Sequence, residues 1–216
     1  MTIQGRLLSG WYLPCWILCL ALVIVGCGGC GAKHGELEIL SPSPTPLPSY
    51  SVSRHSTIFA DDSLRVVVTP LSRYRSHNQP SLVKAILNSG HTVFSISLDN
   101  LSDSKIIYNP SFSHIVDNRL GYKRPLDYTD LYFIVREMEH GEAQMGKMRG
   151  RFYDLAETVQ PGKRVEKLLI FPPLEENSTK AALTMEEVYV GTETMKLTFS
   201  FALASLPITP EASRER

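Results

Sequence analysis

The segment Met195–Ala204 alternates apolar and polar residues without a break, and this pattern constrains the fold of the chain more than any other feature. Apolar side chains stand at positions 195, 197, 199, 201 and 203, and small or polar residues and Lys196 separate them. Alternation with a period of two is typical of a β-strand that has one buried face and one solvated face. The sequence therefore predicts a sheet that covers a hydrophobic core on one side.

Shorter segments upstream have a similar character and are separated by Gly, Pro, Asn and Asp. The turn at Val159–Lys163 has Pro161 in its second position and Gly162 in its third, as a type II turn requires. We predict an all-β fold, an antiparallel β-sandwich of about 7–9 strands over residues 64–204. The other predicted strands are Leu64–Val68, Phe94–Leu98, Lys105–Tyr108, Phe112–Val116, Leu131–Val135, Lys167–Phe171 and Val188–Val190.

Two segments interrupt the strand pattern. Residues 137–148 are polar and broken by glycine, which predicts a long loop rather than a helix. Residues 175–187 contain one or two predicted helical turns, around Thr179–Leu183, before the next strand.

Several strand and turn segments resemble a known family. Phe94–Asp103 is similar to the opening strand and polar turn of bacterial envelope immunoglobulin-like domains, and Phe112–Tyr122 is similar to their following hairpin. Val159–Pro172 resembles their later segment, in which a Pro-Gly turn leads into a strand that ends at proline. Together these segments resemble the telokin-like domains of bacterial cell-surface lipoproteins. The resemblance implies an immunoglobulin-like sandwich, and residues 122–158 have no counterpart in it.

The N-terminus has the character of an export signal. Arg6 precedes a stretch, residues 7–32, that contains no charged side chain, and its apolar part has the length of a secretory signal. Ile24–Cys27 resembles the lipobox of bacterial lipoproteins. The resemblance implies that residues 1–26 are a signal peptide and that Cys27 carries a diacylglycerol group and an N-acyl chain, which together anchor a protein stably to a membrane.

Two other interpretations of this segment remain open. One is an uncleaved N-terminal anchor helix, although the apolar part is short for a membrane span. The other is a redox or metal pair formed by Cys27 and Cys30. No βαβ pattern follows this pair, and the chain has no cysteine beyond Cys30 that could complete a zinc site.

The segment between the signal and the first predicted strand is interpreted as a tether. Residues 27–63 include Ser41–Pro48, where proline occupies every second position and favours an extended polyproline II conformation. Residues 205–216 are predicted to be a flexible tail. Gly28 and Gly29 follow the cysteine, and by the sorting rule of some Gram-negative lipoproteins the absence of aspartate there implies the outer membrane.

Charge and motifs exclude several function classes. The chain has 22 Lys and Arg against 22 Asp and Glu, a balance that argues against a nucleic-acid partner. None of the standard hydrolase, phosphate-binding or metalloprotease motifs occurs in the sequence, so no catalytic, cofactor or metal residues are assigned. Asp99, Asn100 and Asp103 could ligate Ca²⁺, but such residues more often cap turns through their own backbone.

Two groups are the candidate partner contacts. Met138, Met145 and Met148 stand among charged residues in the predicted loop, where methionine would give an adaptable surface. Arg73 and Arg75 form a small basic cluster around Tyr74.

The favoured function is a lipid-anchored envelope module that binds or braces another envelope protein without catalysis. The alternative is a lipid-anchored hydrolase or protease inhibitor on the same scaffold. The hydrolase would need His114 or His140 beside a carboxylate in a cleft, and the inhibitor would need a rigid exposed loop.

Overall fold

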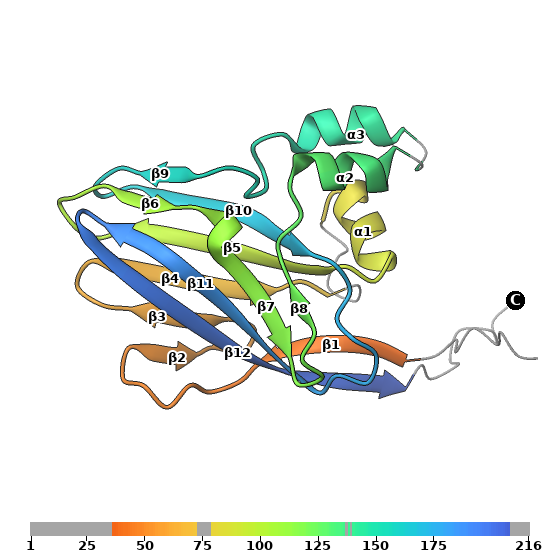
Figure 1. Cartoon of the computed structure of the whole chain (residues 1–216), viewed down its shortest axis with the longest axis horizontal. Helices are drawn as coiled ribbons and strands as arrows, with labels where there is room; N and C mark the ends of the chain where they lie inside the picture. The colour runs from red at the N-terminus through yellow and green to blue at the C-terminus, as the bar shows by residue number, and fades with distance from the viewer. Residues whose placement is uncertain (1–35, 73–78, 137, 139, 208–216) are drawn as a thin grey trace, which may run out of the picture. The chain divides into compact units, whose positions relative to one another are not determined.

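Strands dominate the chain, as shown by a computed structural model that describes residues 36–72, 79–136, 138 and 140–207 (Figure 1). The strands are β1 Glu36–Pro42, β2 Tyr50–Val52, β3 Thr57–Ala60, β4 Leu64–Pro70, β5 Thr92–Asn100, β6 Ile106–Tyr108, β7 Ser113–Asp117, β8 Tyr122–Lys123, β9 Glu157–Val159, β10 Arg164–Phe171, β11 Lys180–Val190 and β12 Glu193–Pro207. The helices are α1 Ser81–Asn88, the 3₁₀ turn η2 Pro110–Phe112, α2 Tyr128–Val135 and α3 Gly141–Met148.

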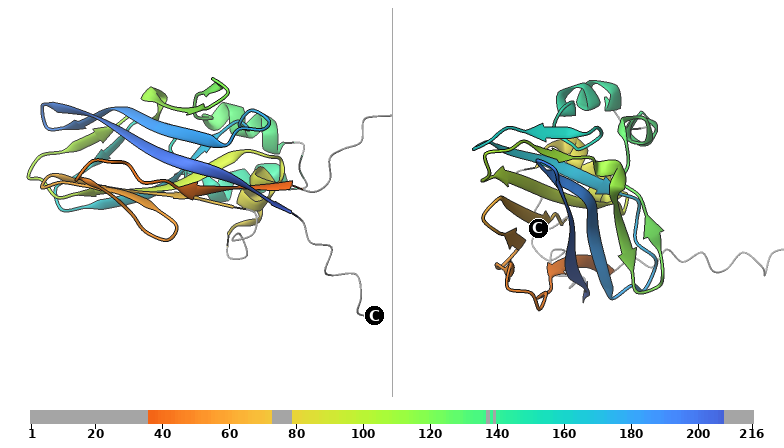
Figure 2. Two further views of the ribbon diagram at one scale, coloured as in Figure 1. Left: turned by 90° about the horizontal axis from the view of Figure 1, so that it is seen from below. Right: turned by 60° about the vertical axis from the view of Figure 1, so that its left-hand side comes forward.

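The strands form two sheets that pack face to face (Figure 2, left). Sheet I has the order β1-β12-β11-β6-β9, and β7 pairs with β11 and β8. Sheet II has the order β10-β5-β4-β3-β2. The ladders within both sheets are antiparallel, so the predicted antiparallel β-sandwich is confirmed. The predicted strand number was too low, because the described residues contain twelve strands.

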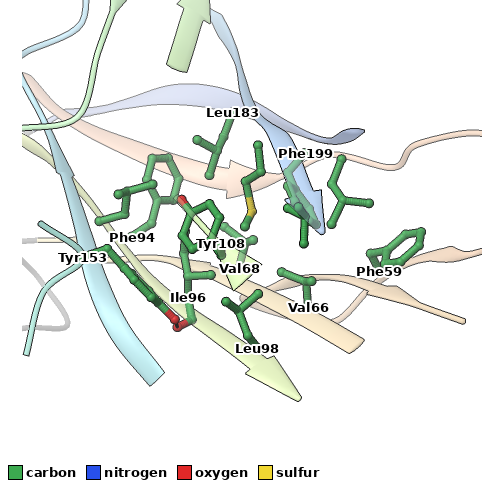
Figure 3. Close-up of a cluster of buried hydrophobic side chains, with 14 of the residues drawn as sticks. Phe59, Val66, Val68, Phe94, Ile96, Leu98, Tyr108, Tyr153, Leu183 and Phe199 are labelled. Atoms are coloured by element: carbon green, nitrogen blue, oxygen red, sulfur yellow. Dashed lines mark hydrogen bonds between the residues drawn. The ribbon is translucent and has the colours of Figure 1, made fainter. Parts of the chain in front are cut away.

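The main core lies between the two sheets (Figure 3). Alternate residues of β4, β5 and β12 point into it because successive side chains of a strand point to opposite faces. The buried residues include most of those on which the strand predictions depended, while Met195 and Leu203 are only partly buried against the same core. The fully buried ones are Leu64, Val66, Val68, Phe94, Ile96, Leu98, Leu197, Phe199 and Phe201. The predicted turn before β10 is also present, with Gly162 at a φ of 65° and a hydrogen bond of 3.0 Å from the Lys163 amide to the Gln160 carbonyl.

The tether predicted for residues 27–63 is wrong from Glu36 onward. β1, β2 and β3 all lie in this range, and the Pro-rich segment Ser41–Pro48 is the end of β1 and the loop to β2. Its Ser43 amide donates a hydrogen bond of 2.9 Å to the carbonyl of Ser200 in β12. Proline is tolerated here because β1 is an edge strand of sheet I, where a missing N–H breaks no ladder. β12 likewise runs to Pro207, so the predicted tail at 205–216 begins too early.

Tyr50 ties the N-terminal strands to the opposite sheet. Its ring centroid lies 5.2 Å from that of Phe59 and 5.7 Å from that of Phe199, both in edge-on geometry. Its hydroxyl accepts a hydrogen bond of 3.1 Å from the backbone amide of Thr198. β2 and β3 are therefore part of the sandwich rather than of a spacer.

Helices α1, α2 and α3 cover one end of the outer face of sheet II and enclose a second core. This second core joins apolar residues of the helices to Val93 of β5 and Ile170 of β10. A hydrogen bond of 2.9 Å from Ser81 Oγ to Gln144 Oε1 links α1 to α3. Within the described ranges, no helix has the length and apolarity needed to cross a membrane.

The helices correct two predictions. Leu131–Val135 is the end of α2 and not a central strand, since an apolar run of five residues suits a helix as well as a strand. Asp127 decides for the helix, because it caps α2 in a reciprocal capping box with Asp130. The predicted loop at residues 137–148 contains α3, whose first residue, Gly141, leaves no room for a Cβ beside the Val135 carbonyl oxygen.

The predicted helical turns at Thr179–Leu183 are also wrong, because Lys180–Val190 is the strand β11. The ladder between β11 and β12 shifts register between Met185 and Val188. Such a bulge places one extra residue in the strand and interrupts the alternation by which a strand is recognised in sequence.

Candidate functional site

Three chain segments that are distant in sequence surround a hollow of about 140 Å³. They are η2 with its flanks, the loop before α2, and the segment that follows α3. We call this the apolar-rimmed hollow. It is lined by Pro110, Ser111, Arg124, Pro125, Leu126, Asp127, Tyr153 and Asp154.

The walls of the hollow are held by local hydrogen bonds. The Asn109 side chain caps η2 by accepting a hydrogen bond of 3.0 Å from the Ser111 amide. Asp127 caps α2 through a hydrogen bond of 2.8 Å from the Asp130 amide to its Oδ1. These two walls therefore have a defined backbone conformation before any ligand binds.

Tyr153 lines the hollow and is almost fully buried. Its hydroxyl donates a hydrogen bond of 3.3 Å to the Ile96 carbonyl, and its ring centroid lies 5.2 Å from that of the buried Tyr108. Burial raises the pKa of both tyrosine hydroxyls, so both stay protonated at neutral pH. Tyr153 therefore supplies a neutral, largely apolar surface.

Three exposed apolar residues lie next in sequence to residues that line the hollow. They are Phe112, Tyr128 and Leu155. Leu155 is the most exposed of the three at 74%. The Tyr128 ring also stacks on Phe152, with 6.2 Å between centroids. Apolar side chains gathered from three segments around a concavity are typical of a protein contact surface.

The Arg124 guanidinium at this hollow is already engaged within the protein. Arg124 donates a hydrogen bond of 2.8 Å to Asp130 Oδ2 and one of 3.1 Å to the Pro125 carbonyl. The hydrogen bond from Arg124 to Asp130 raises the pKa of the guanidinium. The hollow is therefore lined by apolar and polar side chains in similar measure, and its volume of about 140 Å³ is below the roughly 300 Å³ at which small-molecule and cofactor pockets begin.

The methionines predicted as an exposed contact surface lie instead in the second core. Met145 and Met148 are only 1% and 4% exposed, and Met138 is partly buried against the same cluster. Their spacing places Met145 and Met148 on one face of α3, the face that packs toward sheet II. They therefore support the helices and are not available to a partner. The other predicted site residues, Cys27, Arg73 and Arg75, lie outside the described residues.

Asn100 caps a turn, as expected, because its Oδ1 accepts a hydrogen bond of 3.0 Å from the Ser102 amide, whereas Asp99 is a residue of β5 that pairs with arginines. Asn100 is buried, and its amide nitrogen donates hydrogen bonds of 2.8 Å to the Ser104 carbonyl and 2.9 Å to the Val159 carbonyl. Asp99 lies within 3.4 Å of Arg65 and 3.3 Å of Arg164. Among the described residues no group of three His, Cys, Asp or Glu side chains is arranged to hold a metal ion.

The histidines named for a hydrolase do not line the hollows found here. His114 stacks on Tyr122 on the outer face of sheet I, with 5.0 Å between ring centroids. His140 precedes α3 in a left-handed conformation, with a φ of 57°. Two further hollows lie elsewhere on the described surface, an open one beside Leu120 and one of about 270 Å³ between α3 and sheet II. Neither histidine lines either of these or the apolar-rimmed hollow.

Comparisons with known proteins place the chain in no family. A scan against models of protein families gives no match, and a search of curated proteins gives none either. Among solved structures the chain is similar to the crystal structure of the yjhA protein from Bacillus subtilis. That similarity has a TM-score of 0.38 and 11% identity, and it covers 65% of this chain and 93% of the other. It carries no information about function.

The residues of the apolar-rimmed hollow were not found from sequence. Tyr128, Tyr153 and Leu155 lie in residues 122–158, which match no part of the resemblance. The sequence pattern places Phe112 in a strand, whereas it ends the 3₁₀ turn η2. The one local signal was Asn109–Pro110, which marks a turn but does not indicate which segments meet there.

Proposed function

We propose that the chain is a lipid-anchored protein of the bacterial cell envelope, on the outer membrane, whose immunoglobulin-like sandwich binds another envelope component without catalysis. The observation that carries the anchor is an apolar leader that ends in Ile24–Cys27. Only residues 28–35 separate Cys27 from β1. The Gly residues at positions 28 and 29 support the outer membrane.

The apolar-rimmed hollow supports the binding role. Two of its walls are formed by capped turns, and no histidine is among the residues that line it. Its size suits one inserted apolar side chain rather than a substrate. The partner that fits is a protein that presents one apolar side chain surrounded by a surface that can cover Phe112, Tyr128 and Leu155.

Replacing Cys27 with alanine tests the anchor. The Cys27→Ala protein should appear in the soluble fraction after cell lysis, because the thiol that would carry the lipid is gone, whereas the wild type should sediment with membranes. Cys30→Ala is the matched control and should stay with the membranes. A Cys27→Ala protein that still sedimented completely would rule out lipidation as the anchor.

A photocrosslinking amino acid at position 155 tests the contact surface. In living cells it should give a discrete crosslinked product, since Leu155 is exposed and directly follows Asp154, which lines the hollow on which the partner would sit. The control carries the same amino acid in place of Leu101, which is 55% exposed in the β5–β6 loop. Adding Tyr128→Ser should remove most of the product from position 155. Equal products from both positions, or no effect of Tyr128→Ser, would contradict this assignment.

A further inference from the structure

Leu120 combines two features that oppose stability. It is 88% exposed, more than any other large apolar side chain among the described residues. Its φ is 64°, in the left-handed region that a leucine side chain disfavours and that glycine or asparagine adopts more readily. Residues held in such conformations are enriched at functional sites, so Leu120 is a candidate for a functional role.

The hairpin between β7 and β8 holds Leu120 on a rigid support. The Leu120 amide donates a hydrogen bond of 3.1 Å to the Asp117 carbonyl, and the Asp117 amide donates one of 3.2 Å to the Gly121 carbonyl. Asn118 then fastens the hairpin to β11, since its Oδ1 accepts hydrogen bonds from the amides of Thr179 and Lys180. The leucine is therefore presented by a fixed turn and not by a loose loop.

This hairpin lies at the end of sheet I where the chain enters the sandwich. Asp117 pairs with Ala181 of β11, and the neighbouring Lys180 pairs with Ala202 of β12. From there β12 continues toward its end alongside the start of β1 (Figure 1). Leu101, by contrast, lies in the loop between β5 and β6 at the opposite end.

We propose that Leu120 inserts into the lipid surface to which Cys27 anchors the chain. This inference rests on the proposed lipid anchor. Residues 28–35 span at most about 30 Å when fully extended, so the entry end of the sandwich stays close to the bilayer. Because the anchor makes the contact intramolecular, one apolar side chain is enough to orient the domain.

The charges around Leu120 favour a contact with neutral lipid. The open hollow beside the leucine is lined by Arg119, Glu175 and Glu176 among others, and Lys123 forms an ion pair with Glu175. Positive and negative side chains therefore both flank the tip, and no excess of basic residues is available to bind anionic headgroups. We expect the contact to form on phosphatidylcholine and to be insensitive to salt.

A single tryptophan tests the contact, because the native tryptophans, Trp11 and Trp16, are removed with the signal peptide. The lipidated Leu120→Trp protein is reconstituted on phosphatidylcholine vesicles, and flotation and fluorescence are measured together. The emission should shift to the blue, and brominated lipid should quench it at least about twofold more than in the Leu101→Trp control. Leu120→Asn should keep the fold and raise the melting temperature, since asparagine tolerates the left-handed turn.

The outcomes separate this inference from the proposed anchor. If the protein does not float with vesicles, the lipid anchor is wrong and the inference fails with it. If the protein floats but tryptophan 120 is quenched no more than tryptophan 101, the anchor stands and the membrane contact of Leu120 is overturned.

Discussion

A chain that begins at Ser63 should fail to fold, whereas a chain that begins at Glu36 should fold with full cooperativity. The shorter chain lacks β1, β2 and β3, which removes the Tyr50 and Phe59 rings from the main core and leaves Phe199 without its aromatic partner. Removing a buried aromatic side chain typically costs about 3–5 kcal/mol, and a domain has about 5–15 kcal/mol of total stability. Phe59 is buried and Tyr50 is partly buried, so their loss together with three strands removes most or all of this stability.

The truncation also exposes two unpaired strand edges. β4 loses its ladder with β3, and β12 loses β1, so both sheets gain an open edge that favours aggregation. Near-ultraviolet circular dichroism and thermal melting of the two chains give the measurement. A chain from Ser63 that melted within a few degrees of the longer one would place the start of the sandwich at Leu64, as the sequence pattern suggested.

The strands that could be predicted are those in which one face is buried and the other is solvated. In β12 the buried Leu197, Phe199 and Phe201 alternate with partly or fully exposed residues, so the pattern in the sequence is the pattern of the structure. β2 gives no such signal because it is an edge strand of three residues, and β1, the edge strand of sheet I, runs directly into a Pro-rich loop. An edge strand needs fewer apolar residues, and proline there does not exclude a strand.

The helices that cover sheet II were misread for a different reason. Met145 and Met148 stand among polar residues and glycines, so the segment has little apolar periodicity of its own. They are buried because α1 and α2 close over them, which is a tertiary effect. The same effect hides the apolar-rimmed hollow, since Ser111, Leu126 and Tyr153 line one site only after the chain has folded.

Asp117 gives the second large effect. It is buried, its Oδ1 accepts hydrogen bonds of 2.8 Å and 3.0 Å from the amides of Arg119 and Gly121, and its Oδ2 accepts one of 3.0 Å from the amide of Glu175. The carboxylate thus joins the β7–β8 hairpin to the loop before β11. Asp117→Ala leaves three amides without their acceptor and should lower the free energy of unfolding by about 3 kcal/mol.

The pH dependence of stability distinguishes the contribution of the Asp117 charge from that of an uncharged side chain of the same shape. Burial alone would raise the pKa of this carboxyl group, but the hydrogen bonds from the amides of Glu175, Gly121 and Arg119 outweigh it and hold the pKa below its ordinary value. A carboxyl group with a lowered pKa in the folded state stabilises the fold above its unfolded pKa of about 3.9, and that contribution is lost as the pH falls through the folded value. The free energy of unfolding of the wild type and of Asp117→Asn is measured with urea at pH 7 and at decreasing pH. The difference between the two proteins should be largest at pH 7 and should become smaller on acidification. Since the other carboxyl groups titrate equally in both proteins, a difference that stayed constant down to pH 2 would mean that the charge of Asp117 contributes nothing to the hairpin.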